Sequence, residues 1–280
     1  MTRNRNPYLA DEKKPKLINS VFAFMDILGY SDLMMSLSAK RRHQEELEKL
    51  HQTIRNGRNE LEGKNIHPRI KNLSSSDRYA IKAFTDNIVI GWPIRDDAES
   101  ELGEAFEKVG KFQFDMLKAG YFIRGAITIG DAYIDEYAVF GPALIEAYEA
   151  ESNKARDPRI ILTKSATEAT KKHLEYYSDS KHSPQNYDLI QDSDGQWFVN
   201  YLNNTILGEE FGVPLGPIMQ HKKSIESKLS THKEQPAIWS KYAWTANYHN
   251  FFCESHRAHF DKNCMIDINL FKAQLRPIAK

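Results

Sequence analysis

Residues Val21 to Leu33 read VFAFMDILGYSDL. The first five are apolar, a pattern typical of a buried strand. A single carboxylate, Asp26, ends this apolar run, and Gly29 follows three residues later. An aspartate at a strand end commonly starts a turn or caps the next helix, but its oxygens can also bind a metal ion.

A second aspartate occupies a comparable place. Asp86 lies at the tip of IKAFTDNIVI, between two apolar runs, where Asp-Asn is also ordinary hairpin chemistry. Two aspartates at adjacent strand ends can converge, and like charges held close together need a cation to stay ionised. Carboxylate oxygens suit Mg²⁺ or Mn²⁺, and two such ions can activate an attacking oxygen while stabilising a leaving phosphate oxygen.

The surrounding pattern predicts alternating strands and helices. Strands are expected at about 19–26, in a hairpin over 79–92, at 121–134 and at 158–163, with helices from Ser31, at 39–62, 96–120 and 141–155, and a loop at 63–78. A second hairpin over 187–202, with Asp194-Gly195 at its turn, and helices at about 217–231 and 235–258 follow. This order predicts an α+β fold of ferredoxin-like style, with a central, mostly antiparallel sheet flanked by helices.

The composition narrows the class of protein. The chain has 280 residues, and its 38 Lys and Arg balance its 38 Asp and Glu, so no overall basic charge favours nucleic acid as a partner. Two cysteines are too few for a disulfide framework, the polar N-terminus does not resemble a signal peptide, and no apolar run is long enough to cross a membrane. We therefore expect a soluble, cytoplasmic protein that binds neither membrane nor nucleic acid.

Four motifs together resemble those of the class III nucleotide cyclases. FMDILGYS is similar to their first metal motif, KAFTD to their Lys-x-x-Gly-Asp motif with Thr85 in place of the glycine, and RGAITIG to their Arg-x-Gly-x-x-x-Gly strand. FGPALIEAYEAES resembles their glycine-led helix, which ends in Glu-Ser, here Glu151 and Ser152. The resemblance covers about residues 20–165 and implies a class III cyclase core.

The chain departs from the purine cyclases in that last helix. Their transition-state Asn and Arg are replaced by Ile145 and Glu149. With its long C-terminal extension, the chain looks more like the pyrimidine cyclases of bacterial anti-phage (Pycsar) systems. That resemblance implies a homodimer with active sites at its interface, which makes cyclic UMP from UTP, or cyclic CMP from CTP, to activate a separate effector protein. It divides the chain into a flexible tail at 1–17, a catalytic domain at 18–165, and an extension at 166–280 that packs on the core or on the partner chain.

The resemblance also implies roles for individual residues. Asp26, Asp86 and the carbonyl of Ile27 would hold two Mn²⁺ or Mg²⁺ ions. The backbone N–H groups around Leu28, Gly29 and Tyr30 precede a predicted helix, where phosphates bind readily. Lys82 and Phe84 share a strand face with Asp86, and Lys82 would recognise the base. Arg124 could replace the missing arginine, because a guanidinium pairs bidentately with phosphate.

Simpler interpretations of these residues remain open at this point. Gly29 could be an ordinary turn glycine, Lys82 a solvated lysine and Tyr30 a half-buried aromatic residue. His249, Cys253 and His256 fall on one face of a predicted helix and could bind zinc, although their spacing matches no familiar zinc finger. We favour an aromatic helix that packs on the core or on a partner.

Two other functions are compatible with the sequence. One is a non-catalytic nucleotide-binding module on a cyclase-like fold, supported by the altered helix. The other is a different two-metal enzyme, such as a diguanylate cyclase or polymerase-like domain, although their Gly-Gly-Asp type hairpin is replaced here by FTDN.

Overall fold

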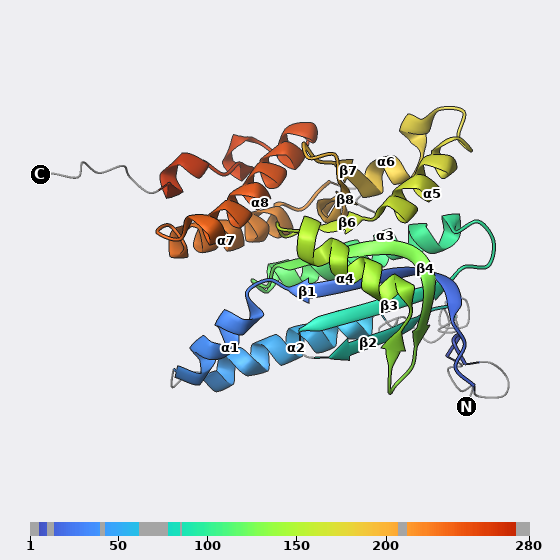
Figure 1. Cartoon of the computed structure of the whole chain (residues 1–280). Helices are drawn as coiled ribbons and strands as arrows, with labels where there is room; N and C mark the ends of the chain where they lie inside the picture. The colour runs from blue at the N-terminus through green and yellow to red at the C-terminus, as the bar shows by residue number, and fades with distance from the viewer. Residues whose placement is uncertain are drawn as a thin grey trace, which may run out of the picture. The chain divides into compact units, whose positions relative to one another are not determined.

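The computed structural model describes residues 6–9, 14–39, 43–61, 78–84, 86–206 and 212–272. The chain divides into two compact units, Met1–Tyr201 and Leu202–Lys280, and each is described by itself (Figure 1). Thr85 at the predicted hairpin tip and most of the predicted loop at 63–78 lie outside the described residues.

The first unit is built on one sheet. Among the described residues the sheet has eight strands in the order β2-β3-β1-β4-β6-β8-β7, with β5 paired to β4. In that part of the chain, β4 and β6 are the one parallel pair. The strands are β1 (Ile18–Ile27), β2 (Ala80–Phe84), β3 (Asn87–Pro93), β4 (Ile123–Ile134), β5 (Val139–Phe140), β6 (Ile160–Leu162), β7 (Leu189–Gln191) and β8 (Trp197–Val199). The predicted α+β class with a mostly antiparallel sheet is confirmed.

Strand β1 lies in the interior of this sheet, between β3 and β4. Successive side chains of a strand point to opposite faces, and both faces of β1 are buried. Val21, Ala23 and Met25 belong to the larger core, which also contains residues of α3 (Glu99–Lys118). Phe24 faces the other way and meets Tyr148 of α4 (Pro142–Lys154) edge to face, with ring centroids 5.7 Å apart.

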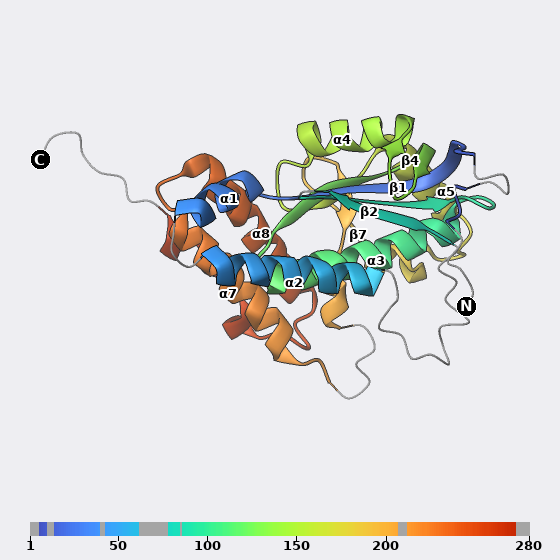
Figure 2. The same cartoon turned by 90° about the horizontal axis from the view of Figure 1, so that it is seen from below.

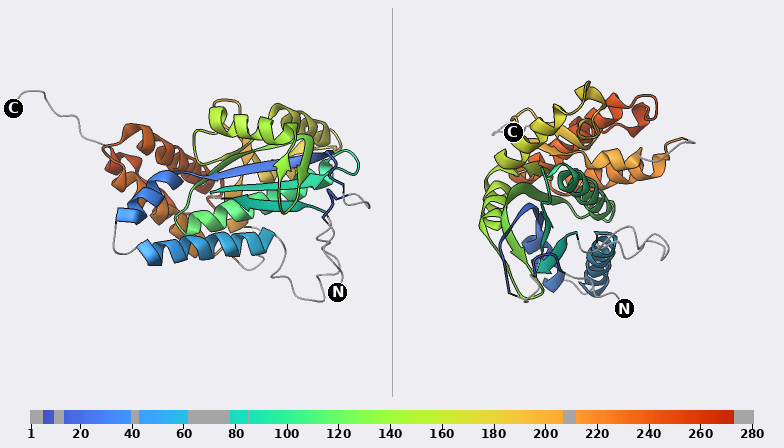
Figure 3. Two further views of the ribbon diagram at one scale, coloured as in Figure 1. Left: turned by 60° about the horizontal axis from the view of Figure 1, so that its bottom comes forward. Right: turned by 90° about the vertical axis from the view of Figure 1, so that its right-hand side faces the viewer.

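Helices therefore cover both faces of the sheet. Figure 2 shows α4 on one face and α3, with α2 (His43–Leu61) beyond it, on the other. The two views of Figure 3 show the same layers. The first unit also contains α1 (Tyr30–Ala39), α5 (Lys164–Leu174), α6 (Gln185–Asp188) and the short 3₁₀ helix η1 (Ser180–His182). The sequence did not predict α5.

The described part of the predicted N-terminal tail is anchored to the sheet. The Tyr8 side chain is fully buried, and its hydroxyl donates to Ser20 Oγ at 2.9 Å. Asn6 Nδ2 donates to the Ile134 carbonyl at 2.7 Å. The Tyr8 hydroxyl lies where a Cβ at position 91 would be, so the close packing at this point requires Gly91.

The predicted second hairpin, β7 and β8, extends the sheet beyond β6. Gly195 has φ +81° at its turn, as the Asp-Gly pair predicts. Arg159, just before β6, pairs with both Asp192 and Asp194 of the hairpin. The first unit runs to Tyr201 and so includes this hairpin.

The second unit consists of two helices and short 3₁₀ turns. These are η2 (Tyr201–Thr205, of which the first residue closes the first unit), α7 (Leu215–Thr231), α8 (Pro236–Ser255), η3 (Lys262–Cys264) and η4 (Ile268–Phe271). Lys222 Nζ donates to the carbonyls of Asn263 and Met265, which fastens η3 to α7. None of the helices in the described residues of either unit combines the length and apolar character of a membrane span.

Candidate active site

Asp26 lies where three strands of the first unit end together. In the sheet register it is opposite Asn87 of β3 and Arg124 of β4. Its side chain shares the sheet face of Phe24, on the side of α4, and is 16 % exposed. A carboxylate so little exposed needs charged or hydrogen-bonding partners, because burial penalises its ionised form.

Asp86 is one of these partners. It immediately precedes Asn87 of β3, which is opposite Asp26, and its carboxylate lies close enough to Asp26 to affect the pKa of that residue. Burial, followed by the hydrogen bond to Asp86 and the charge of Asp86, raises the pKa of Asp26 to about 7. Arg124 opposes this rise, whereas Glu151 adds to it. The structure therefore brings together the two aspartates that the sequence singled out.

Arg124 is the cation of this cluster. Its Nη2 lies 3.2 Å from Asp26 Oδ2, and its Nε lies 2.6 Å from Glu151 Oε1. The N–H of Nε is directed at Asp26 Oδ2, at 3.4 Å. A guanidinium between two carboxylates lowers the repulsion between them.

Glu151 is a member of the cluster whose role sequence reasoning missed. It is 2 % exposed, on the inner face of α4 with Ala143, Ala147 and Ala150. The sequence carries a signal for it: a carboxylate within an otherwise small, apolar stripe at helical spacing is expected to meet a cation. Ser152 Oγ donates to Glu151 Oε2 at 2.9 Å.

The residues predicted to bind phosphate lie where β1 ends and α1 begins. The Leu28 N–H already donates to the Phe122 carbonyl at 2.8 Å, because the β1–β4 ladder continues past the strand end, so it cannot also bind a phosphate. Gly29, with φ +75°, turns the chain into α1, whose first hydrogen bond runs from the Leu33 N–H to the Gly29 carbonyl. The N–H groups of Tyr30 to Asp32 precede that bond and have no acceptor within the helix. Tyr30 itself is partly buried against the main core.

The direction of the Ile27 carbonyl follows from the same ladder. Backbone groups alternate in direction along a strand, and the Leu28 N–H points toward β4. The Ile27 carbonyl thus points toward the β3 side, where Asp86 lies. The Ile27 side chain is buried in the main core.

Lys82 pairs with Val89, and Val89 pairs with Phe24. Paired residues lie on one face of a sheet, so Lys82 shares the face of Phe24 and Asp26. Its Nζ donates to the Glu136 carbonyl, in the turn between β4 and β5, at 2.9 Å. Phe84 is the last residue of β2 and pairs with Asn87; its side chain lies outside what the structure describes.

The site offers oxygen atoms of the kind that a divalent cation binds. In the described part of the chain, no group of three or more His, Cys, Asp or Glu side chains is arranged to hold a metal ion. Two carboxylates and a main-chain carbonyl are hard oxygen donors. Burial and then the neighbouring Asp86 raise the pKa of Asp26, and a cation would relieve both effects. The residues fit a cation that replaces Arg124 at Asp26 Oδ2.

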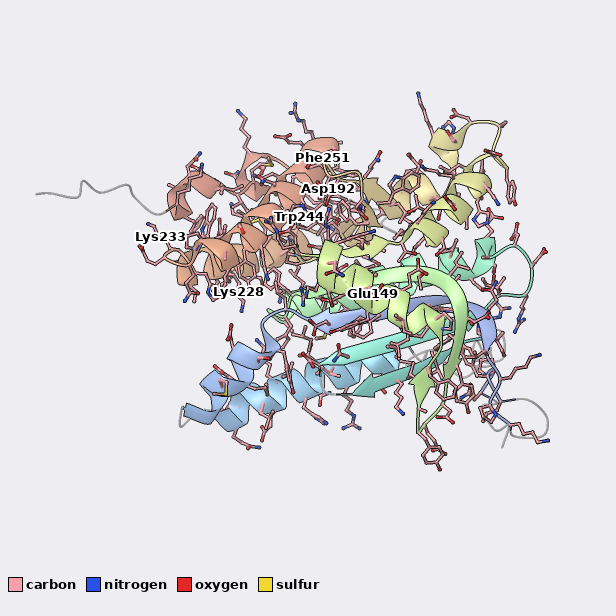
Figure 4. All side chains as sticks on the ribbon, in the orientation of Figure 1. Glu149, Asp192, Lys228, Lys233, Trp244 and Phe251 are labelled. Atoms are coloured by element: carbon pink, nitrogen blue, oxygen red, sulfur yellow. The ribbon has the colours of Figure 1, made fainter. Side chains whose placement is uncertain are left out.

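The two residues of α4 that differ from the purine cyclases lie on the outer side of the helix. The Ile145 side chain is 61 % exposed, and Glu149 is exposed (Figure 4). Neither takes part in the Asp26 cluster. In this structure the guanidinium at the cluster comes from β4 and not from α4.

The zinc interpretation is not supported. His249, in the second unit, is committed through both ring nitrogens: Nδ1 to His221 Nδ1 and Nε2 to the Cys264 carbonyl, each at 2.8 Å. His256 Nδ1 bonds the Phe252 carbonyl instead. Burial raises the pKa of Cys253 to about 12, which keeps its thiol protonated. The cluster is a hydrogen-bonded core of the helix pair.

Comparisons with known proteins found distant structural likenesses. No protein-family model matches the chain, and no curated protein matches it. The monomeric guanylyl cyclase domain of the RhoGC fusion protein from Blastocladiella emersonii is 16% identical, with a TM-score of 0.44, over 66% of this chain and 96% of that one. A class III adenylyl cyclase-like ATP-binding protein from Pseudomonas aeruginosa is 15% identical, with a TM-score of 0.41, over 59% of this chain and 39% of that one.

A third similar structure is the guanylate cyclase domain of RhGC from Catenaria anguillulae, which was solved in complex with GTP. It is 15% identical, with a TM-score of 0.40, over 66% of this chain and 97% of that one. With scores this low, we base the proposed function on the residues of the site.

Proposed function

We propose that this protein is a pyrimidine nucleotide cyclase that converts UTP to 3′,5′-cyclic UMP and pyrophosphate. The observation that carries the proposal is the placement of Asp26 beside Asp86 at adjacent strand ends, where Asp26 pairs with Asn87 shortly before the start of α1. A paired carboxylate cluster beside a helix N-terminus is suited to a triphosphate with its divalent cations.

In this reaction the ribose 3′-oxygen attacks the α-phosphorus. The 3′-hydroxyl gives up its proton to water as its oxygen bonds to the α-phosphorus. The bond from the α-phosphorus to the bridging oxygen breaks, and pyrophosphate leaves with the electron pair. Bound Mg²⁺ or Mn²⁺ supplies activation of the 3′-oxygen and charge neutralisation of the phosphates. Asp26, Asp86 and the Ile27 carbonyl hold the cations. The N–H groups of Gly29 and Tyr30 donate to the outer phosphates, and Arg124 stabilises negative charge on the transferring group.

Base recognition is assigned to Lys82. An ammonium donates to O2 or O4 of uracil and to O2 of cytosine, so cytidylate cyclase activity is the alternative. We place UTP first because uridylate cyclases are the commoner of the enzymes that the chain resembles. The product would activate a separate effector in anti-phage defence.

We further propose a homodimer with its active sites at the interface. Ile145 and Tyr148 expose 61 % and 55 % of their surface on the outer side of α4, and both are large apolar residues. Such neighbouring exposure on one helix is typical of a surface that another chain covers.

The proposal is tested by incubating the protein with each of the four nucleoside triphosphates and Mn²⁺, and separating the products by chromatography. Cyclic UMP is expected from UTP. Asp26→Asn and Asp86→Asn are each expected to lower turnover by at least about a hundredfold, as when a preorganised charge is removed from a transition state. Asp131→Asn, at an exposed carboxylate of β4, is the matched control. Full turnover in either variant would refute the proposal.

A non-catalytic nucleotide-binding module is the second candidate. The ion pair of Arg124 with Asp26 favours it, because that guanidinium already occupies one oxygen of a proposed cation ligand. Tight binding of UTP without any cyclic product, in the same incubation, would select this function instead.

A further inference from the structure

Glu151 presents an unusual feature for a helix that packs on a sheet. Its carboxylate is 2 % exposed among alanines, and burying an unpaired charge is costly. Ser152 donates a hydrogen bond to one of its oxygens, and Arg124 Nε lies beside the other. Arg124 is the cation that neutralises it in the described site.

The two carboxylates contact the Arg124 guanidinium in different ways. Asp26 Oδ2 accepts from Nη2 at 3.2 Å and from Nε at 3.4 Å, whereas Glu151 Oε1 forms an ion pair at 2.6 Å from Nε alone. If Asp26 turned to another cation, Arg124 would still be held by Glu151. Its Nη groups would then be free to donate to a bound anion.

We propose that Glu151 is a positioning residue that holds and neutralises Arg124, so that a divalent cation can replace Arg124 at Asp26. The inference rests on the proposed function only in placing that cation at Asp26. With all four groups ionised, Asp26, Asp86 and Glu151 carry three negative charges against one on Arg124. The net charge therefore matches one divalent cation.

Loss of the Glu151 charge changes this balance in a predictable way. In Glu151→Gln the positive charge of Arg124 is no longer neutralised, and Asp26 becomes its main partner. A divalent cation must then compete with a more tightly held guanidinium and enter a less negative site. Removing Arg124 as well restores the net charge and frees Asp26.

The test measures Mn²⁺ binding to the metal-free protein without nucleotide, by electron paramagnetic resonance or calorimetry. Glu151→Gln is expected to weaken binding by about tenfold, the usual effect of removing a partner that orients a metal site. The double variant Glu151→Gln with Arg124→Gln is expected to bind as tightly as the wild type. Glu149→Gln, two positions away on the exposed side of α4, is the matched control and should change nothing.

Two results would overturn the inference. Unchanged Mn²⁺ affinity in Glu151→Gln would show that Arg124 does not need Glu151. Equally weak binding in the double variant would show that Glu151 acts on the cation directly. If Glu151→Gln does not fold, Arg124→Gln alone decides: tighter binding than in the wild type supports the inference, and equal or weaker binding refutes it.

A second readout requires no metal. Thermal unfolding of the metal-free single and double variants should show that the two losses of stability are not additive, because both substitutions break the same ion pair. Additive losses would contradict the pairing. Cyclic nucleotide synthesis enters neither readout, so a protein without cyclase activity could still show this pattern. A wild type that binds no Mn²⁺ would refute the cation site and this inference together.

Discussion

At the scale of single residues, the placement of Asp26 beside Asp86 is the most consequential feature. Two ionised carboxylates held close together repel each other, and burial, followed by the hydrogen bond and charge of Asp86, raises the pKa of Asp26 to about 7. The proton or a cation must therefore be present for the pair to remain close. This requirement links the stability of the first unit to pH.

The pH dependence of this link has a definite sign. The groups that face Asp26 are Asp86 at the β2–β3 turn, Arg124 on β4 and Glu151 on α4. Its pKa in the folded state, about 7, lies above its ordinary value of 3.8, so the folded state keeps a proton that the unfolded state has lost. The stabilising effect is complete below about pH 4 and is lost as the pH rises through 7.

We therefore expect Asp26→Asn to raise the melting temperature relative to the wild type more at pH 8 than at pH 5.5. Asparagine cannot ionise, so it removes the repulsion that develops in the wild type at high pH. Thermal unfolding of both proteins in metal-free buffer at the two pH values measures this. The same difference at both pH values would show that Asp26 does not titrate in this range.

Gly29 allows a second prediction at this scale. Its φ of +75° strains any other residue, although no atom lies within 4 Å of the place where a Cβ would be. Gly29→Ala should therefore fold, with an unfolding free energy lower by about 1 kcal/mol from backbone strain alone. Gly103→Ala, also in open space but within α3, should instead stabilise by about 0.5–1 kcal/mol. Urea unfolding compares the two variants. Equal effects of the same sign would show that the positive φ of Gly29 does not strain an alanine there.

At the scale of helices and strands, the spacing of apolar residues and the turn-forming residues predicted most of the fold. The apolar run at 19–26 forms β1, the hairpin at 79–92 forms β2 and β3, and the helices at 96–120 and 141–155 form α3 and α4. The helix predicted at 39–62 is α2, which begins at His43. These segments carry either a long apolar run or a clear amphipathic stripe, which are strong local signals.

The elements that escaped prediction lack such signals. The buried positions of α5 are Ala166, Thr170 and His173, which have helical spacing but little hydrophobicity. The engagement of the Leu28 N–H by Phe122 depends on a register between strands that are distant in sequence. The partnership of Glu151 with Arg124 required the packing of α4 on β4 to become visible. Local sequence does not encode these long-range pairings.

The β7–β8 hairpin supports a prediction about a single element. Arg159 is 3 % exposed and pairs with Asp192 and Asp194. Arg159→Met should cost about 3 kcal/mol, because it leaves two aspartates without their cation. Lys164→Met, whose side chain is 86 % exposed and whose partner Glu168 is exposed as well, should change the unfolding free energy by less than about 0.5 kcal/mol. Denaturant titration decides, and a similar cost for both would show that the hairpin does not depend on this pair.

At the scale of the whole molecule, the two units divide the chemistry unequally. Every proposed catalytic residue lies in Met1–Tyr201, whereas both cysteines of the chain lie in Leu202–Lys280. The second unit is held together partly by the buried pair of His221 and His249. Burial lowers the pKa of His249 to about 4 and lowers that of His221 as well, so both rings are neutral in the folded state.

The two units should consequently respond to acid in opposite directions. A histidine with a depressed pKa stabilises the fold above its ordinary value of 6.5, and that stability is lost as the pH falls toward 4. Between pH 7.5 and 5 the second unit should weaken, while the Asp26 contribution strengthens the first. Cys253 and Cys264 are buried, so their reaction with a dithiodipyridine reagent in increasing urea reports the opening of the second unit.

We expect the urea concentration at half-labelling to fall from pH 7.5 to pH 5. His259→Gln, at an exposed histidine, is the control and should keep the wild-type pH dependence. His221→Leu, if folded, should reduce that dependence. A half-labelling concentration that does not change with pH would show that the histidine pair does not govern this unit.

The pairing of β1 with β4 also has a consequence for how the chain is made. Asp26 and Arg124 are 98 positions apart. A ribosome that adds about 5–20 residues per second needs roughly 5–20 s to synthesise the intervening segment. The nascent VFAFM segment lacks both neighbouring strands until β3 (Asn87–Pro93) has been made, and it lacks β4 for the whole interval, so we expect molecular chaperones to bind it there. The cluster of Asp26, Asp86, Arg124 and Glu151 therefore cannot form until α4 has been made.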